Sequence, residues 1–287
     1  MQKLNISALL TIVATLLLSP LVVTAGEKGE LIFGVHPYLH ATTLVERFTP
    51  LTEYLGYKLN QQILIRVATS YQDHINAISQ GDVDFAYMGP ASYIKLAEEN
   101  HDHTLLGRLN FSGKDIFRGA IIIRIDSPLT SLSQLQGKRF AFGDPNSTLS
   151  SKVPQRLLAD AGIYLDDLDG YSHLKNHHNV ALAVLLGKYN AGGVKEEIFH
   201  EYESRGLRVL EWTPYIPTNP FVASSRMAPE QISKLRQLLL TLHNQPYGLS
   251  ILKKIKKGTT AIMPANGKEY ELLRDLIASP DKSTSTN

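Results

Sequence analysis

No cysteine occurs among the 287 residues of the sequence. Its absence excludes disulfides, thiolate zinc sites, iron–sulfur clusters, cysteine nucleophiles and a lipid-modified N-terminal cysteine. An excess of either charge is also missing, because 29 Lys and Arg face 27 Asp and Glu, for a formal net charge of +2. The chain therefore has no electrostatic footprint for nucleic acid. With 43% apolar residues, it is long enough for one large or two medium domains with a substantial core.

Beyond the first 25 residues, no window is long and apolar enough to span a bilayer. In those 25 residues Lys3 is the only charge, an apolar stretch covers 6–23, and Val23-Thr24-Ala25 fits the small-x-small rule of a secretory cleavage site. Polar residues and a proline interrupt the stretch, which argues against a membrane anchor. We expect a cleavable signal peptide at 1–25 and a mature protein free in the periplasm, since no cysteine can carry a lipid.

Strand and helix signals alternate along the rest of the chain, which predicts an α/β protein. Short apolar runs predict strands at 31–35, 63–67, 84–88, 119–124, 139–142 and 209–212. Helical spacing predicts helices at 41–55, 71–79, 151–161, 178–186 and 229–243, with another beginning near Ala91. Four glycines are placed to end helices: Gly56, Gly81, Gly162 and Gly187. Two such αβ blocks, each with a polar junction between a strand and a helix, suggest two lobes.

The junction at 144–151 is the most informative local feature, because ligands of open α/β sheets bind at strand ends. Four hydroxyl residues cluster where it enters its helix: Ser147, Thr148, Ser150 and Ser151. Hydroxyls, free backbone N–H groups and the positive helix end would then point the same way, which favours an oxyanion. The alternative is that one hydroxyl simply caps the helix. The junction is not a P-loop, because it lacks the Gly-x-x-x-x-Gly-Lys pattern.

The histidines and serines give no sign of a metal or of catalysis. Ten histidines are present, but no His-Glu-x-x-His or other tight ligand set occurs, so we predict no metal and no cofactor. No Gly-x-Ser-x-Gly elbow occurs either, and a hydroxyl cluster suits gripping an oxyanion better than activating one nucleophile. His177, at the start of a predicted helix, can contribute to such a site as a neutral donor or a cation, with a solvated loop histidine as the alternative. The sequence thus predicts a binding protein, not an enzyme.

Two long segments carry a resemblance to a known family. Residues 82–93 and 135–148 resemble the phosphate/phosphite/phosphonate-binding proteins of ABC importers, often called PhnD-like. Pro154, His177 and the segment 215–220 support the resemblance, which extends over about 31–240. It implies a two-lobed type II periplasmic-binding fold with two hinge crossovers.

The resemblance also implies lobe boundaries and ligand-binding residues. Lobe one is expected at 30–120 plus 220–287, and lobe two at 121–219. The residues expected to bind the ligand are Tyr38, Tyr93, Ser147, Thr148, Ser150, His177 and Asn219. His178 is the alternative to His177 if the register differs by one residue.

Departures from the family pattern bear on which ligand is bound. Members that take aminoalkylphosphonates place an acidic residue in an Ile-Pro-x-Asp-Pro turn, where this chain has the neutral Asn219. A second departure follows the helix predicted at 178–186, where the sequence contains Lys195, Glu196 and Glu197. If Lys195 faces the cleft, it repels an ammonium and favours a plain anion, or a ligand with its own acidic or hydroxyl group. The carboxylates of Glu196 and Glu197 could instead attract an ammonium, so the sequence does not determine which ligand is bound.

Taken with the resemblance, the sequence predicts a periplasmic solute-binding protein. It would capture a phosphonate-, phosphite- or phosphate-type oxyanion between its lobes and deliver it, as a monomer, to an ABC permease. The alternative is a sensor subunit that uses the same fold to signal to a membrane kinase or cyclase. Contacts on the lobe surfaces leave no sequence motif, so the sequence does not separate these two functions.

Overall fold

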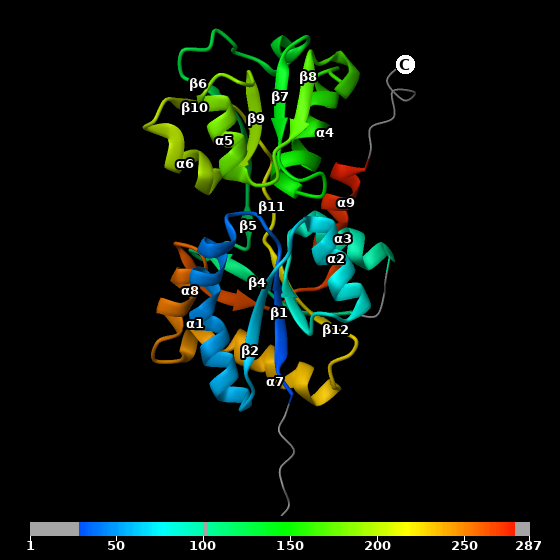
Figure 1. The fold of residues 1–287 in the computed structure, drawn as a ribbon, viewed down its shortest axis with the longest axis vertical. Coiled ribbons are helices and arrows are strands. Elements are labelled where there is room, and N and C mark those ends of the chain that lie inside the picture. Colours follow the sequence, from blue (N-terminus) through cyan, green and yellow to red (C-terminus); the bar gives the residue numbers. More distant parts are fainter. Residues whose placement is uncertain (1–28, 100–102, 279–287) are drawn as a thin grey trace, which may run out of the picture.

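The computed structural model describes residues 29–99 and 103–278, and the predicted signal peptide at 1–25 lies outside these residues. Two sheets lie one above the other, and a short two-stranded ribbon connects them (Figure 1). The ribbon pairs β5 (Ile116–Phe117) with β11 (Ile216–Pro217) in antiparallel fashion. Within the described residues, no helix combines the length and the apolar character needed to cross a membrane.

The first lobe is built on a six-stranded mixed sheet. Its strands are, in sheet order, β13 (Thr259–Met263), β4 (His103–Phe111), β12 (Pro220–Ser224), β3 (Phe85–Tyr87), β1 (Leu31–Val35) and β2 (Ile63–Val67). The helices of this lobe are α1 (Ala41–Leu59), α2 (Tyr71–Gln80), α3 (Pro90–Glu99), α7 (Pro229–Leu240) and α8 (Gly248–Ile255). The N-terminal part of the chain supplies the parallel strands, and later segments add β4, β12 and β13.

The second lobe is built on a five-stranded sheet. Its strands are, in sheet order, β10 (Leu207–Trp212), β6 (Gly119–Arg124), β9 (Ala191–Lys195), β7 (Arg139–Phe142) and β8 (Gly170–His173). Its helices are α4 (Val153–Asp160), α5 (His177–Leu185) and α6 (Glu196–Glu203). The last helix, α9 (Glu271–Ile277), packs against α3 of the first lobe and α4 of the second.

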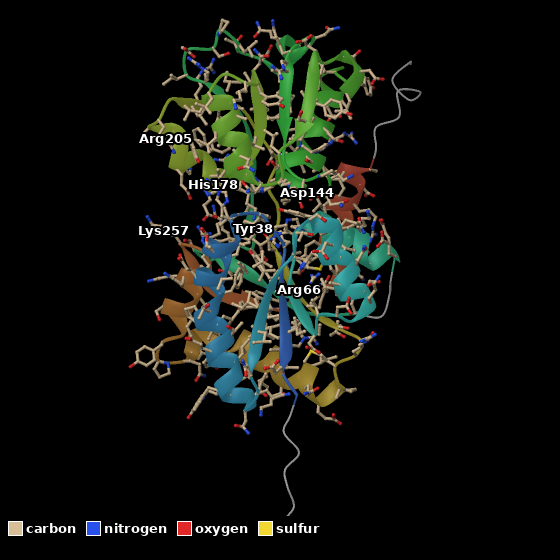
Figure 2. All side chains as sticks on the ribbon, in the orientation of Figure 1. Tyr38, Arg66, Asp144, His178, Arg205 and Lys257 are labelled. Atoms are coloured by element: carbon tan, nitrogen blue, oxygen red, sulfur yellow. The ribbon has the colours of Figure 1, made fainter. Side chains whose placement is uncertain are left out.

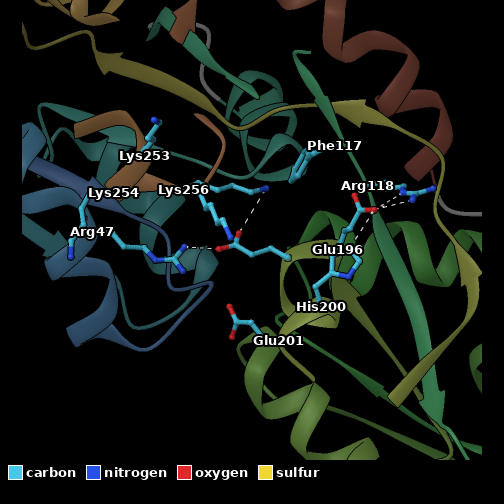
Figure 3. A pocket seen from close by; sticks show the side chains of 11 residues that line it. Arg47, Phe117, Arg118, Glu196, His200, Glu201, Lys253, Lys254 and Lys256 are labelled. Atoms are coloured by element: carbon cyan, nitrogen blue, oxygen red, sulfur yellow. Dashed lines mark hydrogen bonds and ion pairs between the residues drawn. The ribbon is translucent and has the colours of Figure 1, made fainter. Parts of the chain in front are cut away.

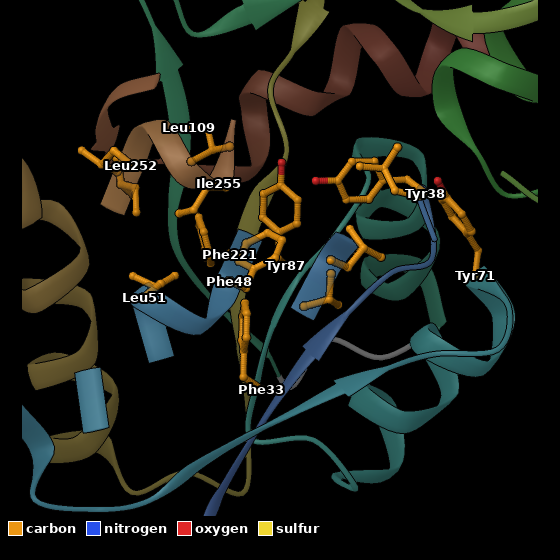
Figure 4. Packing of buried hydrophobic residues seen from close by; sticks show 14 of the residues in the cluster. Phe33, Tyr38, Phe48, Leu51, Tyr71, Tyr87, Leu109, Phe221, Leu252 and Ile255 are labelled. Carbon is orange, nitrogen blue, oxygen red and sulfur yellow. The ribbon is translucent and has the colours of Figure 1, made fainter. Parts of the chain in front are cut away.

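Phe33 lies at the centre of the first lobe's core (Figure 4). Its ring centroid is 4.7 Å from that of Phe85, 5.4 Å from that of Phe48 and 6.3 Å from that of Phe221. All four rings are fully buried. Parallel strands covered by helices on both faces read as continuous apolar runs, which is why β1 is visible in the sequence as Leu-Ile-Phe-Gly-Val.

The helix ends differ from prediction at Gly56 and agree at Gly81. Gly81 ends α2 in the left-handed conformation, with φ of 75°. The first helix instead continues through Gly56 to Leu59 and ends at Asn60, which takes the left-handed conformation with φ of 52°. A Cβ at position 56 would lie 2.8 Å from the carbonyl oxygen of Gln61. Gly56 therefore does not end the helix. It leaves room for the chain to pass close to the helix again at Gln61.

Several elements were not predicted, and β9 shows why. Its sequence, Ala-Gly-Gly-Val-Lys, has low strand propensity and no apolar run. A Cβ at Gly192 would lie 2.6 Å from Val180 Cγ1, so the strand is glycine-rich because α5 packs directly on its backbone. The strands β4, β8 and β13 and the helix α6 were also missed. The helix predicted at 151–161 begins at Val153, because 148–152 form a π-helical turn.

We expect Phe33→Ala to lower the free energy of unfolding by about 3–5 kcal/mol, because it removes a fully buried ring at the centre of an aromatic cluster. Tyr57→Ala is the matched control, since the Tyr57 side chain is 83% exposed, and should change stability by less than about 0.5 kcal/mol. Urea denaturation followed by circular dichroism measures both. Equal losses in the two variants would show that Phe33 is not the core residue described here.

Candidate functional site

Two sets of strand ends face each other between the lobes. In the first lobe β1 runs parallel to β2 and β3, and in the second lobe β7 runs parallel to β8 and β9. Loops at the carboxyl ends of parallel strands are where α/β proteins bind ligands. Figure 2 places Tyr38, Asp144 and His178 at this level between the two sheets. The predicted residues of both lobes therefore face the same region.

The loop after β7 is anchored on the first residue of α2. The Asp144 carboxylate accepts hydrogen bonds from the backbone N–H groups of Tyr71, at 3.1 Å, and of Asn146, at 2.9 Å. A side-chain hydrogen bond joins Ser147 to the Tyr71 hydroxyl, and both residues are buried. Burial raises the pKa of Tyr71, so its hydroxyl stays protonated. Sequence reasoning missed Tyr71, because nothing in its local pattern reveals a contact with a loop more than 70 positions away.

Thr148 connects the same loop to α3 of the other lobe. Its Oγ1 accepts a hydrogen bond of 2.9 Å from the backbone N–H of Ala91, at the start of α3. Beside it, the Ser92 hydroxyl donates to the Asn146 carbonyl oxygen at 3.4 Å. A hydroxyl has one donor and two acceptor positions, so Thr148 can still donate to a ligand. The predicted hydroxyl cluster thus lies at the contact between the lobes.

The last two hydroxyls of the cluster differ in their partners. Ser150 donates to the carbonyl oxygen of Gly193 in β9, at 2.5 Å, so its hydroxyl hydrogen is used inside the second lobe. The Ser151 hydroxyl is buried and has no hydrogen-bond partner among the described residues. Both lie in the π-helical turn at 148–152, a rare conformation that occurs often at functional sites.

His177 presents one ring nitrogen without a partner. It is the first residue of α5, and its Nδ1 accepts a hydrogen bond of 3.1 Å from the backbone N–H of Lys195. The ring must then carry its hydrogen on Nε2, which is buried and has no partner in the described part of the chain. Burial, followed by the charge of Lys195, holds the pKa of His177 well below its ordinary value. His177 is therefore a neutral donor and not a cation.

His178, the alternative to His177, faces a different element. Its Nδ1 lies 3.2 Å from the Tyr202 hydroxyl, and its Nε2 lies 3.6 Å from a carboxylate oxygen of Glu201, both on α6. The structure thus assigns different surroundings to the two neighbouring histidines. Only His177 bonds to the end of β9.

A histidine of the first lobe that sequence reasoning did not single out lies between Tyr38 and Asn219, the residue directly before β12. His36 is buried and donates from Nδ1 to the Tyr87 carbonyl oxygen at 3.0 Å. The Asn219 amide nitrogen donates to the Met88 carbonyl oxygen at 2.6 Å and lies 3.4 Å from His36 Nε2. Tyr38 stacks on His36, with ring centroids 4.8 Å apart. The amide nitrogen of Asn219 is therefore occupied by groups of the first lobe.

Tyr93 lies apart from the other predicted residues. Its ring packs against His103 and Tyr270, with centroids 5.5 and 4.9 Å away. Neighbouring residues of a helix point in directions about 100° apart, so the side of α3 that carries Ala91 and Ser92 toward the hydroxyl loop turns Tyr93 away from it. The structure brings together the other predicted residues, but it does not bring Tyr93 to them.

Lys195 lies at the end of β9 with its ammonium over the Tyr38 ring, 4.1 Å from the centroid. Burial, followed by the charge of Lys256, lowers the pKa of Lys195 to about 7. The two acidic residues that follow it are already paired with cations: Glu196 with Arg118, and Glu197 with Arg47 and Lys256. Figure 3 shows Arg47 and Lys256 reaching one carboxylate from two sides.

The assembled groups suit a buried anion. Hydroxyls of Ser147 and Thr148, the Nε2–H of His177 and the ammonium of Lys195 are all donors, and the nearby carboxylates are engaged. Within the ranges that the structure describes, no group of three or more His, Asp and Glu side chains could hold a metal ion. The arrangement can bind and desolvate an oxyanion.

Comparisons with known proteins agree on one family. The family described as "ABC transporter, phosphonate, periplasmic substrate-binding protein" matches residues 33–270. The "Phosphonates-binding periplasmic protein" of Escherichia coli is 24% identical over 250 residues, which cover 83% of this chain and 73% of that protein. The "Phosphate-import protein PhnD" of Mycolicibacterium smegmatis is 22% identical over 230 residues, which cover 74% and 72% of the two chains.

A solved structure of similar fold extends the likeness to three dimensions. PhnD1 from Prochlorococcus marinus, in complex with methylphosphonate, has a TM-score of 0.78 and 19% identity, and the match covers 86% of this chain and 96% of that one. The resemblance and the two-lobed periplasmic-binding fold that it implied are confirmed. Because the family match spans most of the sequence, this chain belongs to the periplasmic substrate-binding proteins of phosphonate ABC transporters.

Proposed function

We propose that this protein captures a phosphonate-type oxyanion between its lobes in the periplasm and delivers it to an ABC permease. The observation that carries the proposal is the Nε2–H of His177, a buried neutral donor whose partner is missing among the described residues. A buried donor without a partner costs about 1–3 kcal/mol, and a ligand oxygen would remove this cost. The names of the relatives, which bind phosphonates or import phosphate, support the same ligand class.

Selection for an anion follows from how the carboxylates are used. Asp144 accepts two backbone N–H groups, and Glu197 lies between Arg47 and Lys256. The charge of Glu197 is therefore balanced by two cations, while the Ser147 and Thr148 hydroxyls can donate to a ligand. Charge-assisted hydrogen bonds of this kind are about twice as strong as neutral ones.

Closure of the lobes would bury the ligand. Bonds from Asp144 to Tyr71, from Thr148 to Ala91 and from Glu197 to Arg47 already join the two lobes in this structure. We place the hinge in the ribbon of β5 and β11, and lobe boundaries at 30–120 with 220–287 and at 121–219 form part of this proposal. A ligand that touches both lobes favours the closed state by its extra affinity for that state.

The remaining parts of the proposal concern the cellular context. A sensor role is not favoured, since the family and the named relatives are transport proteins. The protein would bind and release its ligand without a chemical step, and would act as a monomer. Export through the signal peptide at 1–25 would place it in the periplasm.

We expect the double variant Ser147→Ala with Thr148→Ala to bind methylphosphonate at least a hundredfold more weakly than wild type. Each lost hydrogen bond to a charged group costs about 1.5–3 kcal/mol. Isothermal titration calorimetry measures the affinity, and a thermal melt checks that the fold persists. The matched control is Thr130→Ala with Ser133→Ala, which removes two exposed hydroxyls of the same lobe. A change below threefold in the first variant would exclude the hydroxyl loop from the site.

We expect His177→Phe to weaken methylphosphonate binding at least tenfold, and by the same factor at pH 6 and pH 8. The reason is that the pKa of His177 lies well below its ordinary value of about 6.5, so the ring stays neutral across this range. Effects of the ligand's own ionisation cancel when variant and wild type are compared at one pH. His178→Phe is the control and should change the affinity by less than threefold. A loss that grows fivefold or more at pH 6 would mean that His177 acts as a cation.

A further inference from the structure

Lys195 is a buried cation without an ionic partner. The residue is only 7% exposed, and in the described part of the chain its ammonium makes no hydrogen bond and no ion pair within 4 Å. Its contacts are the faces of two rings, Tyr38 at 4.1 Å and Phe117 at 5.5 Å from the ring centroids. Charged side chains are seldom buried this deeply unless something pairs with them. The position therefore calls for an anion.

The groups around Lys195 do not supply that anion. Lys256, directly after α8, faces it together with Glu197 of α6 and Arg47 of α1, and the three contribute two positive charges and one negative charge. The carboxylate of Glu197 is already shared between Arg47, at 2.9 Å, and Lys256, at 3.8 Å. Three cations thus surround one engaged carboxylate. The buried histidines on the other side, His36 and His177, are neutral donors or acceptors and cannot balance the excess.

The ammonium of Lys195 lies beside the predicted oxyanion site. Its own backbone N–H bonds to the ring of His177, whose Nε2 is free to donate. After burial, the charge of Lys195 is the largest influence that lowers the pKa of both His36 and His177, so its field reaches both lobes of the site. If His177 and the hydroxyl loop bind the oxyanion of a ligand, the atoms attached to that oxyanion would lie close to the Lys195 ammonium.

Space for the rest of a ligand lies on the same side. A cavity of about 680 Å³ opens between the lobes (Figure 3). The ring of Phe117 forms part of its wall and lies 5.5 Å from the Lys195 ammonium and 5.4 Å from that of Lys256. Six basic and three acidic side chains line the cavity, so it continues the positive field outward. A ligand extended in this direction would meet more cations than carboxylates.

We propose that the ligand carries a second anionic group, a carboxylate or a second phosphoryl group, which binds the Lys195 ammonium while the first oxyanion binds His177 and the hydroxyl loop. This inference rests on the proposed function and narrows its substrate class to doubly anionic phosphonates. The second group would give Lys195 its ionic partner at the point where the chain provides none. An amine-bearing phosphonate would place its ammonium against three cations.

The test compares ligands that differ only by the second group. Phosphonoacetate is methylphosphonate with a carboxylate attached to the methyl carbon, and aminoethylphosphonate carries an amine instead. We expect calorimetry on the wild-type protein at pH 6 to give phosphonoacetate at least tenfold tighter than methylphosphonate, and aminoethylphosphonate the weakest of the three. Lys195→Met should reduce the preference for phosphonoacetate over methylphosphonate below threefold. Lys257→Met is the control, since it removes an exposed cation from the wall of the same cavity and should leave the preference unchanged.

A second measurement follows the preference for phosphonoacetate against pH in the wild-type protein. Because the pKa of Lys195 is about 7, its protonated form is lost as the pH rises through 7, and the preference for phosphonoacetate should fall at least tenfold between pH 6 and pH 9. A folded Lys195→Met variant should show no such fall, and comparison with it removes the effect of ligand ionisation.

Each outcome of these measurements decides between the two proposals. Methylphosphonate bound as tightly as phosphonoacetate, or a preference that survives Lys195→Met, would overturn the role of Lys195 and leave the proposed function standing. Failure of every phosphonate to bind wild-type protein would instead overturn the proposed function, and this inference with it.

Discussion

The hydrogen bond from the Lys195 backbone N–H to His177 Nδ1 determines the chemistry of the site. It joins the end of β9 to the start of α5, two elements that the glycine-rich strand allows to pack closely. Because Nδ1 accepts this bond, the ring hydrogen must be on Nε2, and burial prevents a second protonation. The same bond sets a neutral donor next to the residue that carries the charged ammonium. A neutral hydrogen-bond donor on His177 and a positive charge on Lys195 are thus held side by side by one hydrogen bond.

Polar bonds join the lobes alongside apolar contacts, whereas the core of the first lobe is held by apolar packing. Phe33 and its aromatic neighbours are fully buried in the core of the first lobe. Disrupting such packing costs several kcal/mol of folding free energy, about 3–5 for the loss of one buried ring. The bonds of Asp144 to Tyr71 and of Thr148 to Ala91 can be exchanged for bonds to water, so each contributes only about 0.5–1.5 kcal/mol net. Lobes that are joined in part by exchangeable bonds can open and close while the core of each lobe stays folded. This difference in energy is what a protein needs if it is to capture a ligand and release it again.

Sequence reasoning succeeded where a residue's role is set by its neighbours along the chain. The apolar runs of β1 and β7 and the glycine that ends α2 are local features, and the structure has them where they were predicted. The role of Tyr71 could not be predicted, because it depends on a loop that folding brings from a distant part of the chain. Ser150 shows the same limit, since its hydroxyl serves a strand that the sequence did not reveal.

The departures from the family pattern concern the part of the ligand that differs between phosphonates, and Lys195 explains why. A pKa lowered from 10.5 to about 7 means that keeping this amine charged inside the protein costs about 5 kcal/mol more than in water. The chain bears this cost although Glu197, the nearest acid, is committed to Arg47 and Lys256. An anionic group on the ligand would recover part of it on binding, and a neutral or cationic group would recover none. Selectivity between phosphonates would then come from the protein's own unpaired charge, with the hydroxyl loop and His177 binding the group that all of these ligands share.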